Sequence, residues 1–409
     1  MREMKDSGHE TIGLVPSDWT EKRLKYLCKI QTGNEDTQNA NPEGKYPFYV
    51  RSPIVEHCDR YTFDGEGILV AGDGAGAGRI FHHVYGKYAV HQRVYRLSHF
   101  AGNADFIYYY LSNLFPHEMD KGSAQSTVPS MRLPMLLNFP LFLPSKKEQD
   151  KIVTFLDSKC SEIDAISADI QKEIETLEQY KRSVITEAVT KGLNPEAEMK
   201  DSGIGYIGII PNHWVVEKIK YHLKYRGNRN PGGVQVLSVY REYGVIPKDS
   251  RDDNHNVTSE DTSNYRYVRV GDFVINKMKA WQGSMAISDY EGIVSPAYYV
   301  YEFSDENFDR KYFHYLLRNK MYATEFLRVS GGIRVGQWDL SAYDFENTMA
   351  PMPPIDEQEK IAAFLDTKST EIDSLIGEKK RQLEVLDSYK KSLIYEYVTG
   401  KKEVPLYES

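Results

Sequence analysis

The sequence has 409 residues, with 51 Lys and Arg against 59 Asp and Glu and a formal net charge of −8. A chain of this length has room for two or three domains, each with its own core. No run of about 18 apolar residues is present and the N-terminus has no apolar signal core, so we expect neither a membrane-spanning helix nor secretion. The three scattered cysteines, Cys28, Cys58 and Cys160, favour a reducing, cytoplasmic setting over disulfides or a zinc cluster.

The net charge is unevenly distributed along the chain. Residues 20–144 hold 13 basic and 12 acidic residues, and residues 215–350 hold 18 of each. Residues 145–200 and 351–409 each hold 9 basic and 12 acidic residues, so most of the net negative charge lies in these two segments. A neutral domain can still present a basic face, so the overall acidity neither excludes nor supports a nucleic-acid partner.

A short motif opens each half of the chain. Residues 4–19 contain Met-Lys-Asp-Ser-Gly, then Ile-Gly, Pro and Trp19, and residues 199–214 repeat the pattern up to Trp214. Nine of sixteen positions are identical at an offset of 195. The chain is therefore predicted to be a tandem duplication.

A divergent middle segment follows each motif. Residues 67–71 and 272–276 are short stretches with apolar centres that contain β-branched residues, which predicts buried strands. Each is followed by a loop, a further strand and a short helix at about 106–111 or 312–317. We interpret each middle segment as a strand-rich α+β domain whose loops present side chains.

A long helix ends each half. Eleven of seventeen residues are identical between 148–164 and 357–373, at an offset of 209. Apolar residues then recur every seven positions, which is typical of helices that pack along a seam, and the nearest partner for each helix is the other copy. One line of this seam is predicted at Leu156, Ile163, Ile170, Leu177 and Val184 and at Leu365, Ile372, Lys379, Leu386 and Leu393.

The ends and the polar seam positions of these helices are also predictable. Ser145 with Glu148 forms a capping-box pattern, and Gly192 and Gly400 stand where a C-terminal glycine stop is expected. Polar residues in a seam weaken it but fix its register and partner. Besides Lys379 in the first line, four polar residues, Lys159, Lys368, Glu173 and Gln382, fall on the second seam line. Solvated edges of the coiled coil, or contacts to another protein, are equally consistent with these polar residues.

The glycine-rich loop Gly72–Gly78 is the main candidate for an enzymatic site. A dinucleotide fingerprint requires a helix after the glycines, and a P-loop requires Gly-Lys-Ser/Thr. Here Arg79 and Ile80 follow, in a stretch that favours a strand. We therefore favour a flexible loop that passes close to a ligand, and keep a nucleotide-dependent enzyme as an alternative.

Other catalytic patterns are weak. The histidines at 57, 82, 83 and 91 lack the spacing of a known metal site, so ordinary surface or core roles are expected. The Asn/Asp-Pro-Pro-aromatic motif of amino-methyltransferases is missing, because Met352-Pro-Pro-Ile355 has neither the polar nor the aromatic residue. A coiled-coil scaffold that binds only proteins is the remaining alternative.

The two duplicated motifs, in this order, resemble the specificity subunits of type I restriction–modification systems. The resemblance covers essentially the whole chain, with Thr11 departing where the family often has an aromatic residue, as at Tyr206. It implies two α/β target-recognition domains separated by two long helices in an antiparallel intramolecular coiled coil. The implied division is 1–144 (first domain), 145–192 (helix), 193–353 (linker and second domain), 354–400 (helix) and 401–409 (tail).

The resemblance also implies partners and chemistry. Each domain would read one half of an asymmetric, bipartite site in double-stranded DNA. Two methylation subunits would dock on the helices, and restriction subunits would join them. This chain would be non-catalytic and bind no cofactor. Adenine-N6 methylation with S-adenosylmethionine, and ATP- and Mg²⁺-dependent cleavage, would belong to the partner subunits.

The residues that contact DNA are predicted from side-chain chemistry. Arg and Lys suit guanine, while Gln and Asn suit adenine, and any of them can contact phosphate instead. Loop residues of these types in the first domain are Arg79, Gln92, Arg93 and Gln125. In the second domain they are Lys277, Lys279, Gln282, Arg334 and Gln337, with Trp281 as a residue that stacks or wedges.

Overall fold

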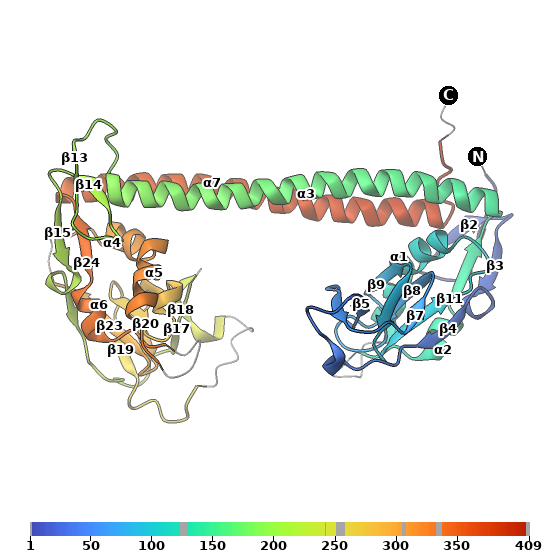
Figure 1. The fold of residues 1–409 in the computed structure, drawn as a ribbon, viewed down its shortest axis with the longest axis horizontal. Helices are drawn as coiled ribbons and strands as arrows, with labels where there is room; N and C mark the ends of the chain where they lie inside the picture. The colour runs from blue at the N-terminus through green and yellow to red at the C-terminus, as the bar shows by residue number, and fades with distance from the viewer. Residues whose placement is uncertain are drawn as a thin grey trace. The chain divides into compact units, whose positions relative to one another are not determined.

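The computed structural model describes residues 2–122, 129–241, 243–250, 258–304, 308–332 and 338–405. The chain packs into two compact units (Figure 1). Unit 1 holds residues 1–170 and 381–409, and unit 2 holds residues 171–380. Each unit therefore contains one mixed domain and a stretch of both long helices. The division into domains at 144, 192, 353 and 400 stays a prediction.

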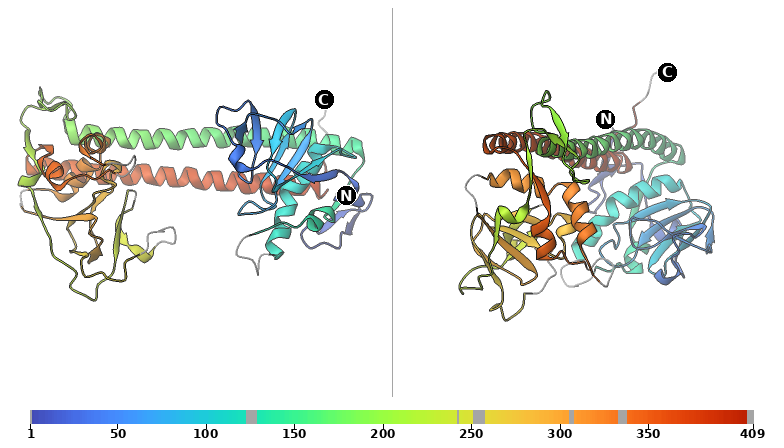
Figure 2. Two further views of the ribbon diagram at one scale, coloured as in Figure 1. Left: turned by 60° about the horizontal axis from the view of Figure 1, so that its bottom comes forward. Right: turned by 60° about the vertical axis from the view of Figure 1, so that its left-hand side comes forward.

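Two long helices run antiparallel, as predicted. Helix α3 spans Lys146–Lys191 and helix α7 spans Ile355–Val398. In unit 1 the Lys390 Nζ atom lies 2.6 Å from Asp164 Oδ1, and the rings of Tyr397 and Phe155 are 4.5 Å apart. Numbers therefore rise along α7 as they fall along α3, and Figure 2 shows the two helices side by side in two further views.

The second seam line differs from the prediction by one position. Lys159 and Lys368 each pair with a glutamate three residues further along their own helix and lie outside the seam. The line that packs includes buried Cys160 and Ile174, whereas Lys379 of the first line reaches across to Glu173 at 2.5 Å. The line that packs is hard to recognise from the sequence, because the aliphatic stem of a lysine can cover a seam while its ammonium group stays in water.

The domain of unit 1 is built on small sheets. One four-stranded sheet has the order β4-β11-β8-β9 and a second has the order β6-β5-β10-β7, while β1 pairs with β2 and β12 with β3. Its strands are β1 Met4–Asp6, β2 Leu14–Pro16, β3 Thr20–Arg23, β4 Lys29–Thr32, β5 Tyr46–Tyr49, β6 Glu56–Cys58, β7 Phe63–Asp64, β8 Gly67–Ala71, β9 Phe81–Val84, β10 Lys87–Val90, β11 Val94–Ser98 and β12 Pro140–Leu143. Its helices are η1 Leu24–Tyr26, η2 Thr37–Asn39, α1 Ala104–Gly122 and α2 Leu133–Leu137.

The domain of unit 2 repeats this plan. A four-stranded sheet of order β16-β23-β20-β21 matches β4-β11-β8-β9, and β15 pairs with β24 as β3 pairs with β12. Its strands are β13 Met199–Asp201, β14 Ile209–Pro211, β15 Val215–Lys218, β16 Leu223–Tyr225, β17 Leu237–Tyr240, β18 Gly244–Pro247, β19 Arg266–Val268, β20 Phe273–Asn276, β21 Met285–Ile287, β22 Gly292–Val294, β23 Tyr298–Phe303 and β24 Met349–Met352. Its helices are η4 Ile219–Tyr221, η5 Lys248–Ser250, η6 Ala280–Gln282, α4 Arg310–Leu317, α5 Lys320–Val329 and α6 Ala342–Asn347.

In each unit one core joins the sheet, a helix and the coiled coil. In unit 1 it includes Val70 of β8, Phe106 of α1 and Leu156 of α3. In unit 2 it includes Ile275 of β20 and Leu365 of α7. Burying large apolar side chains is the main favourable term in folding, so each domain is fixed to its helices by a shared core. The α+β duplication predicted from the sequence is therefore confirmed.

The repeated N-terminal motif packs against the C-terminal end of a long helix in each unit. In unit 1 the fully buried Trp19 packs on Gly400, and in unit 2 Trp214 packs on Gly192. Both glycines have φ near +70°, and a Cβ added at Gly400 would lie 2.9 Å from the Trp19 ring. Only glycine both ends the helix in a left-handed conformation and leaves room for the tryptophan.

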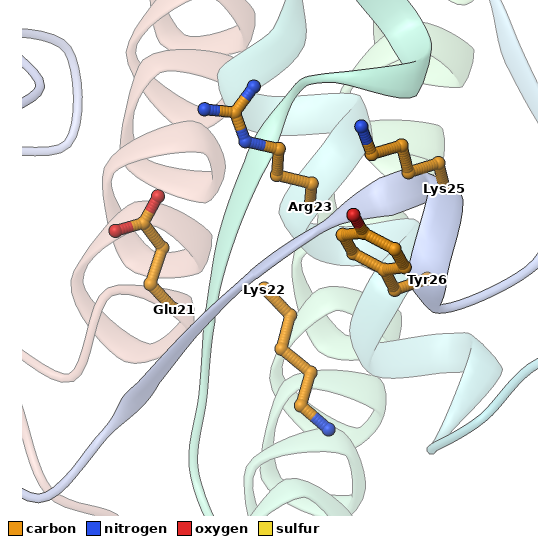
Figure 3. Close-up of a pocket in the computed structure, with 5 residues that line it drawn as sticks. All are labelled: Glu21, Lys22, Arg23, Lys25 and Tyr26. Carbon is orange, nitrogen blue, oxygen red and sulfur yellow. The ribbon is translucent and has the colours of Figure 1, made fainter.

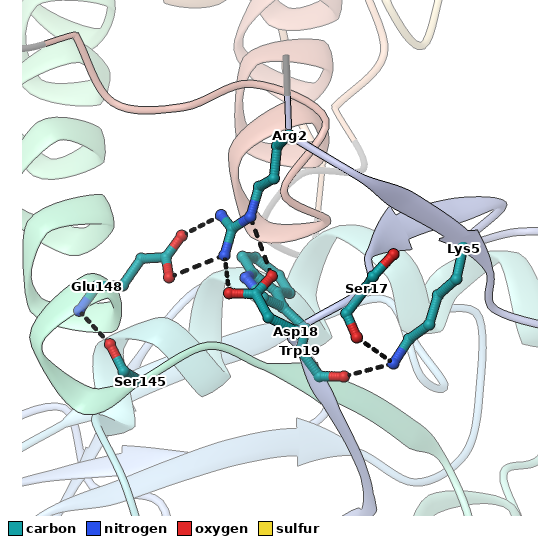
Figure 4. Close-up of polar contacts among 7 residues, drawn as sticks. All are labelled: Arg2, Lys5, Ser17, Asp18, Trp19, Ser145 and Glu148. Atoms are coloured by element: carbon teal, nitrogen blue, oxygen red, sulfur yellow. Dashed lines mark hydrogen bonds and ion pairs between the residues drawn. The ribbon is translucent and has the colours of Figure 1, made fainter.

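Glu148 at the start of α3 is held by Arg2 in unit 1. The Ser145 hydroxyl accepts a hydrogen bond from the Glu148 backbone N–H, as the capping box predicts. The Glu148 carboxylate, however, lies 2.5 Å from Arg2, which also binds Asp18 (Figure 4). The hydrogen bond to Glu148 is the main reason why the pKa of Arg2 is raised.

Candidate nucleic-acid interface

In unit 1, three loops meet at one end of the strands of the β4-β11-β8-β9 sheet. We call this end, and its equivalent in unit 2, the loop edge. Strands β4 and β8 both end there, and β11, antiparallel to both, begins there. The Gly33 N–H donates to the Val94 carbonyl, and the Gly72 N–H donates to the Arg93 carbonyl. A Cβ at Gly33 would lie 2.1 Å from the Val90 carbonyl oxygen, so the loops can approach this closely only through glycine.

Two exposed arginines are anchored by one carboxylate at this edge. Arg93 lies 2.5 Å from Asp73 Oδ2, and Arg51 lies 2.9 Å from Asp73 Oδ1. Partial burial opposes ionisation of Asp73, but the hydrogen bonds from the two arginines outweigh it and lower the pKa of Asp73. Each arginine uses one terminal nitrogen here, so its remaining N–H groups stay available for a base or a phosphate.

The other predicted residues of the first domain are divided between two places. The Gln92 side chain donates to Asp36 Oδ2 at 2.9 Å, within the same loop edge as Arg93. Arg79 pairs instead with Asp120 of α1 at 2.5 Å. The structure therefore brings Gln92 and Arg93 together and directs Arg79 toward the end of α1. Gln125 lies outside the described residues.

The loop edge of unit 2 has the same position in its sheet but a different chemistry. Strands β16 and β20 end there and β23 begins there. The Lys277 N–H donates to the Ala297 carbonyl, and the Lys277 ammonium lies 2.8 Å from Asp339. A lysine held by an aspartate thus occupies the place where unit 1 has paired arginines.

A 3-10 turn carries the remaining candidates of unit 2. Lys279 is exposed, and Gln282 is partly exposed on η6. Trp281 donates its Nε1–H to the Met278 carbonyl, and its ring meets Trp338 edge to face at 5.6 Å. Trp281 is partly buried and packs against the core of the unit 2 domain. Arg334 and Gln337 lie outside the described residues.

Arg51 is a candidate that the sequence reasoning missed. It follows the strand β5 in a stretch without a glycine loop, and its partner Asp73 is 22 residues away. An exposed arginine directly after a half-buried aromatic strand was the available signal. The pairing itself became visible only in the tertiary structure, because β5 and β8 belong to different sheets.

The glycine loop Gly72–Gly78 does not form a nucleotide cradle. It connects β8 to β9 as an antiparallel hairpin, with Val70 opposite Phe81. A phosphate-binding loop would lead into a helix N-terminus, which is the element that stabilises phosphate charge. The alternative of a nucleotide-dependent enzyme is therefore not supported.

The histidines have separate roles in the described part of the chain. His83 lies between two carboxylates, 3.1 Å from Glu66 and 3.0 Å from Asp105, whereas burial lowers the pKa of His82. Within the described residues, no three His, Cys, Asp or Glu side chains gather in a way that could hold a metal ion. Over the same residues, no helix combines the length and the apolar character needed to cross a bilayer.

Comparison with known proteins gives one consistent family. The sequence model described as "Type I restriction modification DNA specificity domain" matches residues 16–176 and again residues 224–385. These two matches cover most of the chain and fall one on each half of the duplication.

Two curated relatives are similar over most of their length. The type I restriction enzyme EcoDI specificity subunit of Escherichia coli is 22% identical over 404 residues, covering 90% of this chain and 86% of that protein. The type I restriction enzyme MjaVIII specificity subunit of Methanocaldococcus jannaschii is 24% identical over 426 residues, covering 95% and 94%.

A solved structure has a similar fold. It is described as "Structural basis underlying complex assembly and conformational transition of the type I R-M system", and one of its chains aligns with a TM-score of 0.64 at 14% identity. The alignment covers 95% of this chain and 99% of that chain.

Proposed function

Because the chain belongs to the type I restriction–modification DNA specificity family, we propose that each of its domains reads one half of a bipartite, asymmetric site in double-stranded DNA. The observation that carries this proposal is the pair of loop edges. Each stands at the equivalent end of a four-stranded sheet with the equivalent strand order, but one presents Arg51 and Arg93 and the other presents Lys277. Equal frameworks with different donors suit two half-sites of different sequence.

The proposal assigns the chemistry to other subunits of the complex. Adenine-N6 methylation with S-adenosylmethionine, and ATP- and Mg²⁺-dependent cleavage, take place on methylation and restriction subunits in the cytoplasm. The role of this chain is to place them on DNA. Its loop edges support this role, because they offer positioned hydrogen-bond donors that match base edges and phosphates.

The coiled coil supplies a surface for two methylation subunits. Four large apolar side chains on it are 47–55% exposed, and they are equivalent in pairs at the offset of 209. These are Ile166 and Leu375, and Tyr180 and Tyr389. All four lie on the helix line next to the seam, the same line that holds Lys159 and Lys368.

The antiparallel register brings one aliphatic residue and one tyrosine of this set together in each unit. The ion pair of Asp164 with Lys390 puts Ile166 and Tyr389 at one level of unit 1. The pair of Lys181 with Asp373 does the same for Tyr180 and Leu375 in unit 2. The chain thus presents the same apolar pair twice, which suits two copies of one partner better than two different partners.

Removing one apolar pair should remove one methylation subunit. We expect Ile166→Ser with Tyr389→Ser to lower the stoichiometry from two methylation subunits per chain to one, measured by native mass spectrometry. The control is Val385→Ser, because Val385 is 67% exposed on α7 but its counterpart in the repeat is Thr176. Retention of both subunits by the double variant would contradict the docking surface.

The half-site assignment is tested by exchanging one domain. Replacing residues 215–350 with the corresponding segment of a homologue should change one half of the methylated motif and leave the other half unchanged. Single-molecule sequencing of genomic DNA reads the motif directly. A change in both halves, or an unchanged methylome after deletion of the gene, would contradict the proposal. The latter result would favour a scaffold that binds only proteins, a reading that the family match does not support.

A further inference from the structure

Each unit carries a second basic constellation away from its loop edge. In unit 1, Arg23 and Lys25 both donate to the side-chain oxygen of Asn138, at 3.4 and 3.3 Å. In unit 2, Lys218 and Lys220 both donate to Asn347, each at 3.2 Å. We call these sets, with the adjacent tyrosines Tyr26 and Tyr221, the unit 1 anchor and the unit 2 anchor.

The asparagine in each anchor is fixed in one orientation. The Asn138 side-chain nitrogen donates to the Pro134 carbonyl of α2 at 2.9 Å, and the Asn347 nitrogen donates to the Tyr343 carbonyl of α6 at 2.9 Å. Because the nitrogen is used in this way, the oxygen must face the two cations. The convergence of two positive groups on one neutral atom is therefore built into both domains.

The anchors keep their positive charge. The ion pairs seen among the described residues include none with Arg23, Lys25, Lys218 or Lys220. An amide oxygen satisfies hydrogen bonds but neutralises no charge, so each anchor remains a site for an external anion. By contrast, Arg51, Arg93 and Lys277 at the loop edges all face an aspartate.

The surface around the unit 1 anchor is hollowed and accessible. Glu21, Lys22, Arg23, Lys25 and Tyr26 line a hollow of about 510 Å³ (Figure 3). Figure 3 shows the ends of Arg23 and Lys25 on the same side, with the end of Lys22 pointing the other way. Tyr26 is 70% exposed, with the Lys25 ammonium 5.1 Å from its ring centre, and Tyr221 is 62% exposed beside Lys220.

The repeat itself indicates what kind of ligand the anchors bind. The loop edges have diverged between the units, but the anchors are the same in charge, partner type and register: Arg23 faces Pro140 across β3 and β12, and Lys218 faces Met349 across β15 and β24. Two different half-sites share no base sequence, but they share the phosphate backbone. Lys, Arg and Tyr are residues that commonly contact DNA phosphates.

Resting on the proposed function, we infer that the two anchors bind backbone phosphates that flank each half-site. Within each domain the anchor stands at the start of β4 or β16, and the loop edge stands at its end. The four residues of β4 span about 13 Å and the three residues of β16 about 10 Å, which correspond to about four and three base-pair steps of 3.4 Å. The anchors therefore position each domain on the duplex outside the bases that it reads, without regard to sequence.

The test measures DNA affinity against salt for the full chain assembled with its methylation subunits. Each phosphate contact contributes about 0.9 to the slope of log affinity against log salt concentration. Arg23→Gln with Lys25→Gln, and separately Lys218→Gln with Lys220→Gln, should each lower that slope by about 2. Affinity for cognate and non-cognate duplexes should fall by the same factor, and the methylated motif should stay unchanged.

Two further variants control for charge and folding. Lys360→Gln with Lys391→Gln removes the same charge from exposed ion pairs on α7 and should leave the slope unchanged. Asn138→Asp keeps the shape of the anchor and both cations but gives them an internal carboxylate, so it should lower the slope as well. Shortening the duplex to the last recognised base pair should reduce wild-type binding to the level of the anchor variants.

Two results would overturn the inference. One is that an anchor variant shows the same slope of log affinity against log salt concentration as the α7 control variant. The other is loss of methylation subunits with an unchanged slope, which would mean that the anchors bind an acidic protein surface. If the wild-type complex fails to distinguish cognate from non-cognate DNA, the proposed function fails; if it distinguishes them but the anchor variants keep the wild-type slope, only this inference fails.

Discussion

The two units use the same framework to hold different loop edges. In unit 1 the Tyr109 hydroxyl donates to Asp157 of α3 at 2.7 Å, and in unit 2 Tyr315 donates to Asp366 of α7 at 2.8 Å. Burial, and then the hydrogen bond to the aspartate, raise the pKa of Tyr315 to about 12. Gln149 likewise donates to the Pro144 carbonyl, as its counterpart in α7 does to Pro353.

The difference between the units lies where the proposed function needs it. The hydrogen bonds made by Tyr109 and Gln149 in unit 1 are reproduced in unit 2, whereas the loop edge changes from arginines on Asp73 to a lysine on Asp339. A duplicated framework can keep its helix contacts under one set of packing constraints while its loops vary freely. Contacts common to both units therefore suit roles that the two domains share, whereas the loop-edge contacts found in one unit suit one half-site.

The largest effect is expected from the loss of an arginine at the loop edge of unit 1. We expect Arg93→Ala to lower affinity for cognate DNA about 10- to 100-fold, because a well-placed bidentate contact to guanine contributes about 1–3 kcal/mol. The loss should depend on the bases of one half-site only. Fluorescence anisotropy on duplexes with one substituted half-site at a time measures this.

Arg79 provides the matched arginine for that experiment. Its guanidinium pairs with Asp120 of α1 and does not share Asp73, so Arg79→Ala should change affinity much less than Arg93→Ala. If Arg93→Ala instead weakened recognition of both half-sites equally, the arginine would contact the backbone and the loop edge would not be the site of base readout.

The two motif tryptophans differ in hydrogen bonding, which predicts a difference in their contributions to stability. Trp214 donates its Nε1–H to Glu357 at 3.0 Å, but the buried Nε1 of Trp19 has no hydrogen-bond partner in the described part of the chain. A hydrogen bond to a charged group contributes about 1.5–3 kcal/mol. We therefore expect Trp214→Phe to lower the free energy of unfolding by about that much more than Trp19→Phe, as measured by urea denaturation.

The contrast arises from Arg2. Its guanidinium forms an ion pair with the carboxylate of Glu148, the residue that corresponds to Glu357, and lies 5.6 Å from the Trp19 ring centre. Arg2→Gln should release Glu148 and narrow the difference between the two tryptophan substitutions. Equal losses for Trp19→Phe and Trp214→Phe in the wild-type background would mean that packing, and not the Glu357 hydrogen bond, determines the contribution of Trp214.

Local patterns predicted the duplication, the main strands and both long helices. Such features depend on periodicity and on residues close in sequence, as in the buried strands at 67–71 and 273–276. The second seam line escaped prediction because it includes Lys181 and Lys390, whose apolar stems pack while their charged ends reach aspartates. A heptad read only from apolar residues cannot detect such positions.

The loop edges were only partly predictable, for a different reason. Loop position and side-chain type were sufficient to select Gln92 and Arg93, but the pairing of Arg51 with Asp73 depends on how two sheets pack together, which the sequence pattern leaves open. The anchors escaped for the same reason, because Asn138 lies more than 110 residues from Arg23 and Lys25. Contacts of long sequence separation require the tertiary fold before they can be recognised.

The smallest expected effect tests whether the helix contacts are as equivalent as the repeat suggests. The ion pair of Lys181 with Asp373 in unit 2 has the same lengths within 0.2 Å and the same lysine exposure, 28%, as the pair of Lys390 with Asp164 in unit 1. Exposed pairs contribute about 0.2–1 kcal/mol each. Double-mutant cycles with Lys→Gln and Asp→Asn should therefore give equal coupling energies for both pairs. Both should vanish near 1 M salt, where screening acts within about 3 Å. A coupling confined to one pair would show that one half of the framework has been adapted to its own domain.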